Sequence, residues 1–208
     1  MAKRVEGVTE KLLESAKKEF LKNGYENASL QMIAKKAGSS KGAIYIRYPD
    51  KKSLYCALVE PTADEFCNLL ERKLRGFEAL PSEEQKENIM VFGDDGFPKV
   101  IAYIYDHFDE FKLILTSGEN STYQKFMHRI IDLDISCTMQ FIEQTGNDAL
   151  SSGRLTPELA YLLSSAFYSG MFEVVIQDMP QDQAVEHIQR MRRFYTAGWK
   201  TIFEGDMG

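Results

Sequence analysis

Apolar side chains recur every three or four positions along most of this sequence, and the alternating pattern of β-strands is scarce. In the first segment Leu12, Ala16 and Phe20 repeat at intervals of four, and Gly24 follows them. A stripe with this period lies along one side of a helix, and a glycine after it is a common stop. The sequence therefore predicts an all-α fold whose first helix spans roughly residues 6 to 23.

Two short helices are expected next. Ser29 is a good N-cap for a helix that is closed by Gly38. Ser40 is a good N-cap for a helix from about Lys41 to Arg47, which stops before Pro49. A short helix, a turn that contains glycine and a second short helix have the layout of a helix-turn-helix. The second helix would then be the one that enters the major groove of DNA.

The charges are divided unevenly along the chain, although its net charge is −6. Residues 1–53 hold twelve Lys or Arg against six Asp or Glu, whereas residues 54–208 hold 13 against 25. A basic segment gains free energy from counterion release on a phosphate backbone, and an acidic segment is repelled from it. The two parts are therefore expected to face different partners, unless the basic segment arises by chance.

Candidate DNA contacts lie in the two short helices and at the start of the next one. Ile44 is expected to face inward and to leave the neighbouring side chains outside. Hydroxyl and amine groups are typical phosphate donors, whereas Arg47 or Gln31 could contact base edges. Gly42 and Ala43 leave space for a close approach at a helix N-terminus, which favours phosphate. The full set is Ser29, Gln31, Ser40, Lys41, Gly42, Ala43, Tyr45, Arg47 and Lys51.

An ordered motif runs through residues 16–54, AKKEFLKNGYENASLQMIAKKAGSSKGAIYIRYPDKKSL. Its elements are Phe20, Gly24-Tyr25, Ala28-Ser29, Ile33-Ala34, Ala37-Gly38, Ser40-Lys41-Gly42, Tyr45 and Lys51. This motif resembles the DNA-binding domain of the tetracycline-repressor (TetR/AcrR) family of bacterial transcriptional regulators. It departs from the family pattern at Ser39, where an apolar residue is usual, and at Ala43-Ile44 and Arg47-Tyr48. The resemblance implies a dimeric repressor with a ligand-binding C-terminal helical domain.

The rest of the sequence is also expected to be helical. Asp50 is a candidate cap for a fourth helix, in which Pro61 predicts a kink near Val59 and Glu60. We divide the chain into a DNA-binding domain over 1–50 and a ligand-binding and dimerisation domain over 51–208. Further helices are predicted at about 83–92, 98–106, 108–117 and 121–146, with a turn at 93–96. Two helices are expected to close the chain. The first is capped by Thr156 and has Pro157 in its first turn, and the second follows Pro180.

The two closing helices carry wide apolar stripes together with small residues that permit a close approach between helices. Paired across a twofold axis, they would form a four-helix dimer interface. The alternative is that the stripes belong to the core of a single chain. The predicted interface residues are Leu162, Ala166, Ser169, Gly170, Val185, Ile188, Tyr195 and Trp199.

The middle of the chain is rich in aromatic residues, which could line a pocket for a drug-sized, partly aromatic small molecule. Ordinary core packing is the alternative for most of them. The residues selected as candidate ligand contacts are Tyr103, Phe126, Phe141 and Phe167.

No metal, cofactor or catalytic site is expected. His107 follows Asp106 and His128 lies four residues before Asp132, but two such groups do not make a metal site. No HExxH, Walker-type or GxGxxG motif occurs, so an enzyme is not predicted, although triads also assemble from distant positions.

The sequence predicts a soluble cytoplasmic protein. Its three cysteines are widely spaced, the N-terminal segment is charged without a signal-like apolar run, and the uncharged run Leu159 to Phe172 has 14 residues. Such a run is short of the roughly 20 residues that cross a bilayer.

The function that combines these expectations is a homodimeric repressor, released from a palindromic DNA operator by a small molecule. Two alternatives stay open. One is a helical ligand-binding or enzymatic protein that uses its N-terminal domain for assembly, and the other is a regulator that answers to a protein partner.

Overall fold

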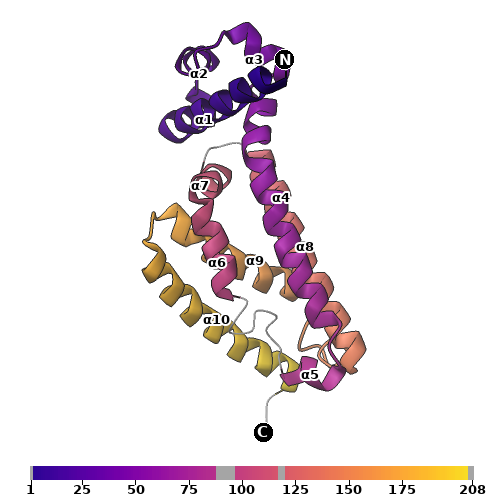
Figure 1. The fold of residues 1–208 in the computed structure, drawn as a ribbon. Helices are drawn as coiled ribbons and strands as arrows, with labels where there is room; N and C mark the ends of the chain where they lie inside the picture. Colours follow the sequence, from indigo (N-terminus) through magenta and orange to yellow (C-terminus); the bar gives the residue numbers. More distant parts are fainter. Residues whose placement is uncertain (1, 88–96, 117–119, 206–208) are drawn as a thin grey trace. The chain divides into compact units, whose positions relative to one another are not determined.

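The structure is a computed structural model that describes residues 2–87, 97–116 and 120–205 (Figure 1). Within these ranges every regular element is a helix, so the all-α prediction is confirmed. The helices are α1 (Ala2–Asn27), α2 (Leu30–Lys36), α3 (Lys41–Arg47), α4 (Lys51–Glu78), α5 (Ser82–Glu87), α6 (Phe97–Asp106), α7 (Phe108–Thr116), α8 (Asn120–Thr145), α9 (Pro157–Ile176) and α10 (Gln181–Glu204).

Contacts along the chain define two units. Unit 1 contains residues 1–65 and 107–125, and unit 2 contains residues 66–106 and 126–208. Helices α4 and α8 each begin in unit 1 and end in unit 2. The basic N-terminal segment therefore lies in unit 1.

Helix α1 is the centre of unit 1 and packs against α2 and α7, while α2 packs against α3. Its predicted apolar stripe is fully buried, as is Ile44 from α3. Helix α7 is bound to α1 by an ion pair between Lys17 Nζ and Glu110 Oε1 at 3.1 Å. It is bound to α4 by the Tyr55 hydroxyl, which donates to the Leu113 carbonyl at 2.9 Å.

The first helix is interrupted at Gly24, as predicted. This residue has φ 71° and ψ 168°, a conformation that is essentially restricted to glycine. The chain then makes one further turn to Asn27, which directs Tyr25 back toward the core. The Tyr25 ring lies 6.0 Å from that of Phe20 and 5.2 Å from that of Tyr55.

Most of the remaining predicted helices are confirmed, with small shifts at their ends. The Asp50 carboxylate accepts a hydrogen bond from the Ser53 backbone N–H at 2.6 Å, next to the start of α4. Pro61 lies inside α4 without ending it, and the kink stays a prediction. The expected helix at 83–92 is found as α5, but its later residues and the turn at 93–96 lie outside the described residues.

Aromatic side chains form much of the core of unit 2. The Phe66 ring lies 5.8 Å from Phe126, 5.7 Å from Phe172 and 6.2 Å from Tyr103. A separate contact joins Phe141 to Phe203, whose centroids are 4.9 Å apart. Aromatic pairs at these distances add to the stabilisation from their buried area.

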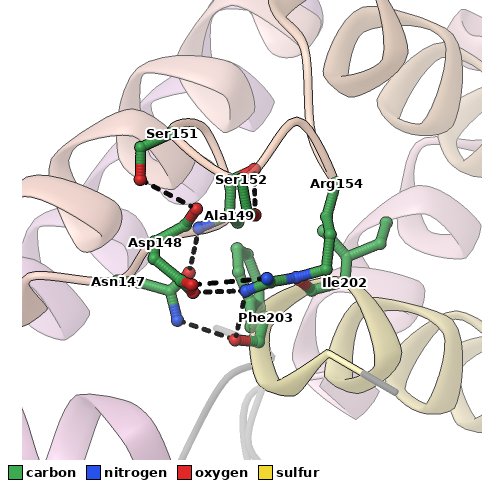
Figure 2. A network of polar contacts seen from close by, with 8 residues as sticks. All are labelled: Asn147, Asp148, Ala149, Ser151, Ser152, Arg154, Ile202 and Phe203. Atoms are coloured by element: carbon green, nitrogen blue, oxygen red, sulfur yellow. Dashed lines mark hydrogen bonds and ion pairs between the residues drawn. The ribbon is translucent and has the colours of Figure 1, made fainter.

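A polar network in unit 2 holds the C-terminal end of α10 (Figure 2). Arg154 Nε donates to the Ile202 carbonyl at 2.8 Å, and the Asn147 amide donates to the Phe203 carbonyl at 3.0 Å. Arg154 also forms an ion pair with Asp148. Because the last carbonyls of a helix lack partners within it, these donors stabilise the end of α10.

Helix α9 is long and apolar enough to cross a membrane, by length and composition. In this structure Phe167, Tyr168 and Phe172 are buried inside unit 2. Ser164 Oγ donates to the Asp134 carboxylate at 2.5 Å, and burial raises the pKa of Asp134 above its ordinary value. The core helix of a soluble protein has the same composition, and this packing favours that interpretation of α9.

Candidate nucleic-acid interface

Both short helices of unit 1 begin at the serines that the sequence predicts as caps. Ser29 Oγ accepts a hydrogen bond from the Met32 N–H at 3.4 Å, and Ser40 Oγ accepts one from the Ala43 N–H at 3.1 Å. Gly38 has φ 64° in the turn between the helices. The two hydroxyl oxygens therefore position α2 and α3, in addition to their predicted role as phosphate donors.

One side of α3 is buried and the other is exposed. Ile44 is fully buried, whereas Tyr45 is 46% exposed and Ile46 is 85% exposed. Lys41 is exposed, and its Nζ lies 5.7 Å from the centroid of the Tyr45 ring. The accessible surface of α3 therefore combines a cation, an aromatic hydroxyl and a large apolar side chain.

Arg47 is turned toward α1 rather than left outside, which differs from the expectation. Its Nε donates to Thr9 Oγ1 at 3.3 Å, and its Nη1 donates to the Ala43 carbonyl at 3.1 Å. A long side chain at the end of a short helix can reach back to a neighbouring helix, and spacing alone does not indicate this. Its contact with base edges stays a prediction, which would require these hydrogen bonds to be exchanged.

Lys51 holds the start of α4 against the last turn of α1. Its Nζ donates to the Glu26 carbonyl at 2.8 Å and lies 4.9 Å from the centroid of the Tyr25 ring. Gln31 is exposed on α2. The DNA contacts of both residues stay predictions.

Glu19 joins α1 to α2 and was missed by the sequence reasoning. Its buried carboxylate accepts from Lys36 Nζ at 2.8 Å, from the Asn23 amide at 2.9 Å and from the Ser29 N–H at 3.4 Å. The hydrogen bond from Lys36 holds the pKa of Glu19 below its ordinary value, against the opposing effect of burial. The available signal was a carboxylate next to Phe20 in the buried stripe of α1.

The four candidate ligand contacts are not brought together. Tyr103 and Phe126 belong to the cluster around Phe66, and Phe141 packs against Phe203. The Phe167 ring lies 5.1 Å from that of Tyr195. The three phenylalanines are buried, as core residues are, and their role in binding a ligand stays a prediction.

The predicted dimer residues differ widely in exposure. Leu162 is 63% exposed, whereas Ile188 is buried within unit 2. Ala166 and Ser169 are exposed, and the other four positions, Gly170, Val185, Tyr195 and Trp199, are partly exposed. A side chain at Gly170 would place its Cβ 2.9 Å from Met191 Sδ, so this glycine permits close packing of α9 and α10 within one chain. Phe194 on α10 is 75% exposed and was missed.

The described part of the chain contains no group of three or more His, Cys, Asp or Glu that could hold a metal ion. Cys56, Cys67 and Cys137 are not joined in disulfides, and burial raises the pKa of the Cys137 thiol to about 12.

Comparison with known proteins supports the resemblance. Residues 12–58 match the family described as bacterial regulatory proteins, tetR family. The uncharacterised HTH-type transcriptional regulator YuxN of Bacillus subtilis is 41% identical over 66 residues, which are 31% of this chain and 23% of that protein. The HTH-type transcriptional repressor AcnR of Corynebacterium diphtheriae is 35% identical over 54 residues, which are 26% of this chain and 28% of that protein. The matches thus span about a quarter of these relatives.

Solved structures share the fold over most of the chain. A transcriptional regulator from Aquifex aeolicus has a TM-score of 0.58 at 19% identity, covering 90% of this chain and 99% of its own. SmeT, the repressor of a Stenotrophomonas maltophilia multidrug efflux pump, has a TM-score of 0.55 at 17% identity. The match covers 85% of this chain and 83% of SmeT. The segment 12–58, which contains the capped helix-turn-helix, is thus similar to the DNA-binding part of the tetR family of bacterial regulatory proteins.

Proposed function

We propose that this protein is a transcriptional regulator that binds a palindromic DNA operator as a homodimer and is released by a small molecule. The observation that carries the proposal is α3, a short capped helix that presents Lys41 and Tyr45 to solvent on a basic segment. Residues 1–50 would contact DNA, and residues 51–208 would bind the ligand and form the dimer. The protein would act in the cytoplasm without catalysing a reaction, and cysteines that are not joined in disulfides fit a reducing compartment.

Contact with DNA is tested first, because it supports the rest of the proposal. Duplexes bound by the protein are selected from a random pool at low ionic strength, and Kd is then measured against salt concentration. Lys41→Ala should weaken binding to all duplexes and lower the salt slope by about 1, because one phosphate contact is lost. Tyr45→Phe should weaken binding with little loss of stability.

Lys86→Ala is the matched control, since it removes the same charge from α5 in unit 2. Wild-type affinity and salt slope in Lys41→Ala would show that α3 is not the contact surface. A monomeric protein that binds no duplex would overturn the proposal.

The dimer is supported by apolar side chains that unit 2 leaves exposed. Leu162 on α9 and Phe194 on α10 are 63% and 75% exposed, and α9 packs against α10. Exposure of such groups to water is unfavourable, and a twofold pairing of the same surface would bury them. Leu162→Glu should shift sedimentation toward the monomer, whereas Leu150→Glu, at an exposed loop position, should not.

Release by a small molecule is supported by the family and by the course of α4. This helix begins at Lys51, which holds the last turn of α1, and it continues through Pro61 into unit 2. A ligand that displaces α4 would change the spacing of two recognition helices, which must match major grooves about 34 Å apart. Once a screen has found a ligand, Pro61→Ala should change its effect on operator affinity. An unchanged effect would remove Pro61 from the mechanism.

A further inference from the structure

We propose that Ile46 determines specificity by contacting the 5-methyl group of a thymine in the major groove. This inference rests on the proposed function, because it takes duplex DNA as the partner of α3. It adds the chemistry that α3 recognises, which is an apolar group on a base edge rather than a hydrogen-bonding group.

The first observation is the exposure of Ile46. At 85% it is the most exposed large hydrophobic side chain in the described part of the molecule. It lies two residues after Ile44, which is fully buried, so the two side chains are on opposite sides of α3. Among the described residues of unit 1 none covers this side chain to any large extent, and a partner that covers Ile46 would gain free energy from burying it.

The second observation is the character of the helix surface around Ile46. Gly42 precedes it by four positions and therefore shares its side of α3. A Cβ at Gly42 would meet only Ser40 Oγ, at 3.8 Å, so packing does not require a glycine there. Glycine costs about 1 kcal/mol relative to alanine inside a helix. Gly42 and Ile46 together form a ridge of α3. This ridge has one apolar side chain, no side-chain hydrogen-bond donor and room for a close approach.

Thymine is the base whose edge fits such a ridge. In the major groove each base pair presents donors and acceptors, and the C5 methyl of thymine is the apolar group among them. Lys41 and Tyr45 flank Ile46 with a cation and a hydroxyl, which suit the phosphates beside a groove. Arg47, the other candidate for base contact on α3, is engaged with Thr9 and Ala43.

The alternative occupant of an exposed apolar side chain is another protein surface, such as a second copy of this chain. The charge of this segment favours DNA, since residues 1–53 hold twice as many cations as anions whereas the rest of the chain is acidic. A phosphate backbone therefore complements the surroundings of Ile46. A protein partner is an outcome that the following experiment would reveal.

The experiment uses the full-length protein and the duplex that it selects from a random pool. Each thymine is replaced in turn by deoxyuridine, which removes the methyl group and keeps the hydrogen-bonding pattern. We expect the affinity of the wild type to fall about fourfold at one thymine in each half-site, which is the effect of one buried methyl-sized group. Ile46→Ala should bind the thymine and deoxyuridine duplexes equally, and Ile46→Val should retain most of the discrimination.

Leu21→Ala is the control variant, because it truncates a partly exposed apolar side chain of α1. It should keep the fourfold difference, and thermal unfolding should show that all the variants are folded. The inference is overturned if no deoxyuridine lowers wild-type affinity, or if Ile46→Ala discriminates as the wild type does. It is equally overturned if Ile46→Ala changes self-association instead of the response to the methyl group. In these cases specific binding to the selected duplex still supports the regulator, whereas failure to bind any duplex overturns both.

Discussion

Unit 1 and unit 2 are both helical, but different interactions organise them. In unit 1, Ser29, Ser40 and Asp50 fix the starts of three helices, and Glu19 joins α1 to α2 through hydrogen bonds. In unit 2, aromatic rings from distant parts of the sequence pack around Phe66. Polar contacts with defined geometry fix the direction of a helix, whereas aromatic packing mainly supplies buried area. Successive caps thus organise a short stretch of unit 1, whereas unit 2 combines a cap at the start of α9, from Thr156, with packing between distant segments.

The largest expected effect concerns the aromatic core. Phe66→Ala should reduce the free energy of unfolding by about 3 to 5 kcal/mol, because it removes a buried ring and leaves a cavity. Urea unfolding followed by circular dichroism measures this loss. Leu150→Ala, at an exposed position in unit 2, should change stability by less than about 0.5 kcal/mol. Similar losses in the two variants would contradict the role of Phe66 as the centre of the core.

A smaller effect is expected from the polar network at the end of α10 in unit 2. Asn147→Ala removes the bond to the Phe203 carbonyl and the bond from the Ala149 N–H to the Asn147 side chain. The expected loss is about 1 to 3 kcal/mol in chemical unfolding, for two hydrogen bonds. Ser151→Ala, which removes one exposed bond to the Asp148 carbonyl, is the control and should have little effect. Equal stability of Asn147→Ala and the wild type would show that packing alone holds α10.

In unit 1, Glu19→Gln should lower stability at neutral pH by about 1 to 2 kcal/mol, because the substitution removes the carboxylate charge that pairs with the exposed Lys36. The pKa of Glu19 is lowered from 4.5 in the folded state, so its contribution is complete above that value and is lost as pH falls through the folded pKa. The stability of the wild type should therefore decline more steeply below about pH 4.5 than that of the variant.

Unfolding curves measured between neutral and acidic pH provide the test. Glu10→Gln makes the same change of charge at an exposed position of α1 and controls for net charge. A pH profile in Glu19→Gln that is parallel to that of the wild type would exclude Glu19 as a source of the acid sensitivity.

The smallest effect has the opposite sign. Gly42→Ala should raise stability by up to about 1 kcal/mol, since alanine favours the helix and the added Cβ has room. The same substitution should weaken binding to the selected duplex, because the Cβ occupies the space for close approach. Gly76→Ala, where nothing lies within 4 Å, should stabilise α4 without changing DNA affinity. Unchanged DNA affinity in Gly42→Ala would show that the ridge of α3 does not approach DNA closely.

The comparison of the two units also explains what the sequence could predict. The bounds of α2 and α3 follow from Ser29, Gly38 and Ser40, because capping signals act within a few residues along the chain. The exposure of Ile46 follows in principle from the helical period and the burial of Ile44. The engagement of Arg47 with Thr9 does not, since it depends on how α3 meets α1.

The packing partners of the aromatic residues in unit 2 were harder to predict from the sequence. Phe126, Phe141 and Phe167 are all aromatic, but they pack in separate groups because their neighbours come from different helices. The continuation of α4 past Pro61, in contrast, was predicted from the sequence and is confirmed. A proline weakens a helix locally, and packing along the whole length of α4 outweighs that effect.

The backbone conformation at Gly24 limits which residues can replace this glycine. Its φ of 71° with ψ of 168° is unfavourable for every residue that has a Cβ, so substitution there would disturb the last turn of α1. That turn supplies the Tyr25 ring and the Glu26 carbonyl to Lys51. One position without a side chain of its own thus supports the contacts at the start of the long helix α4, and a substitution there should loosen that start without removing any of the proposed DNA contacts.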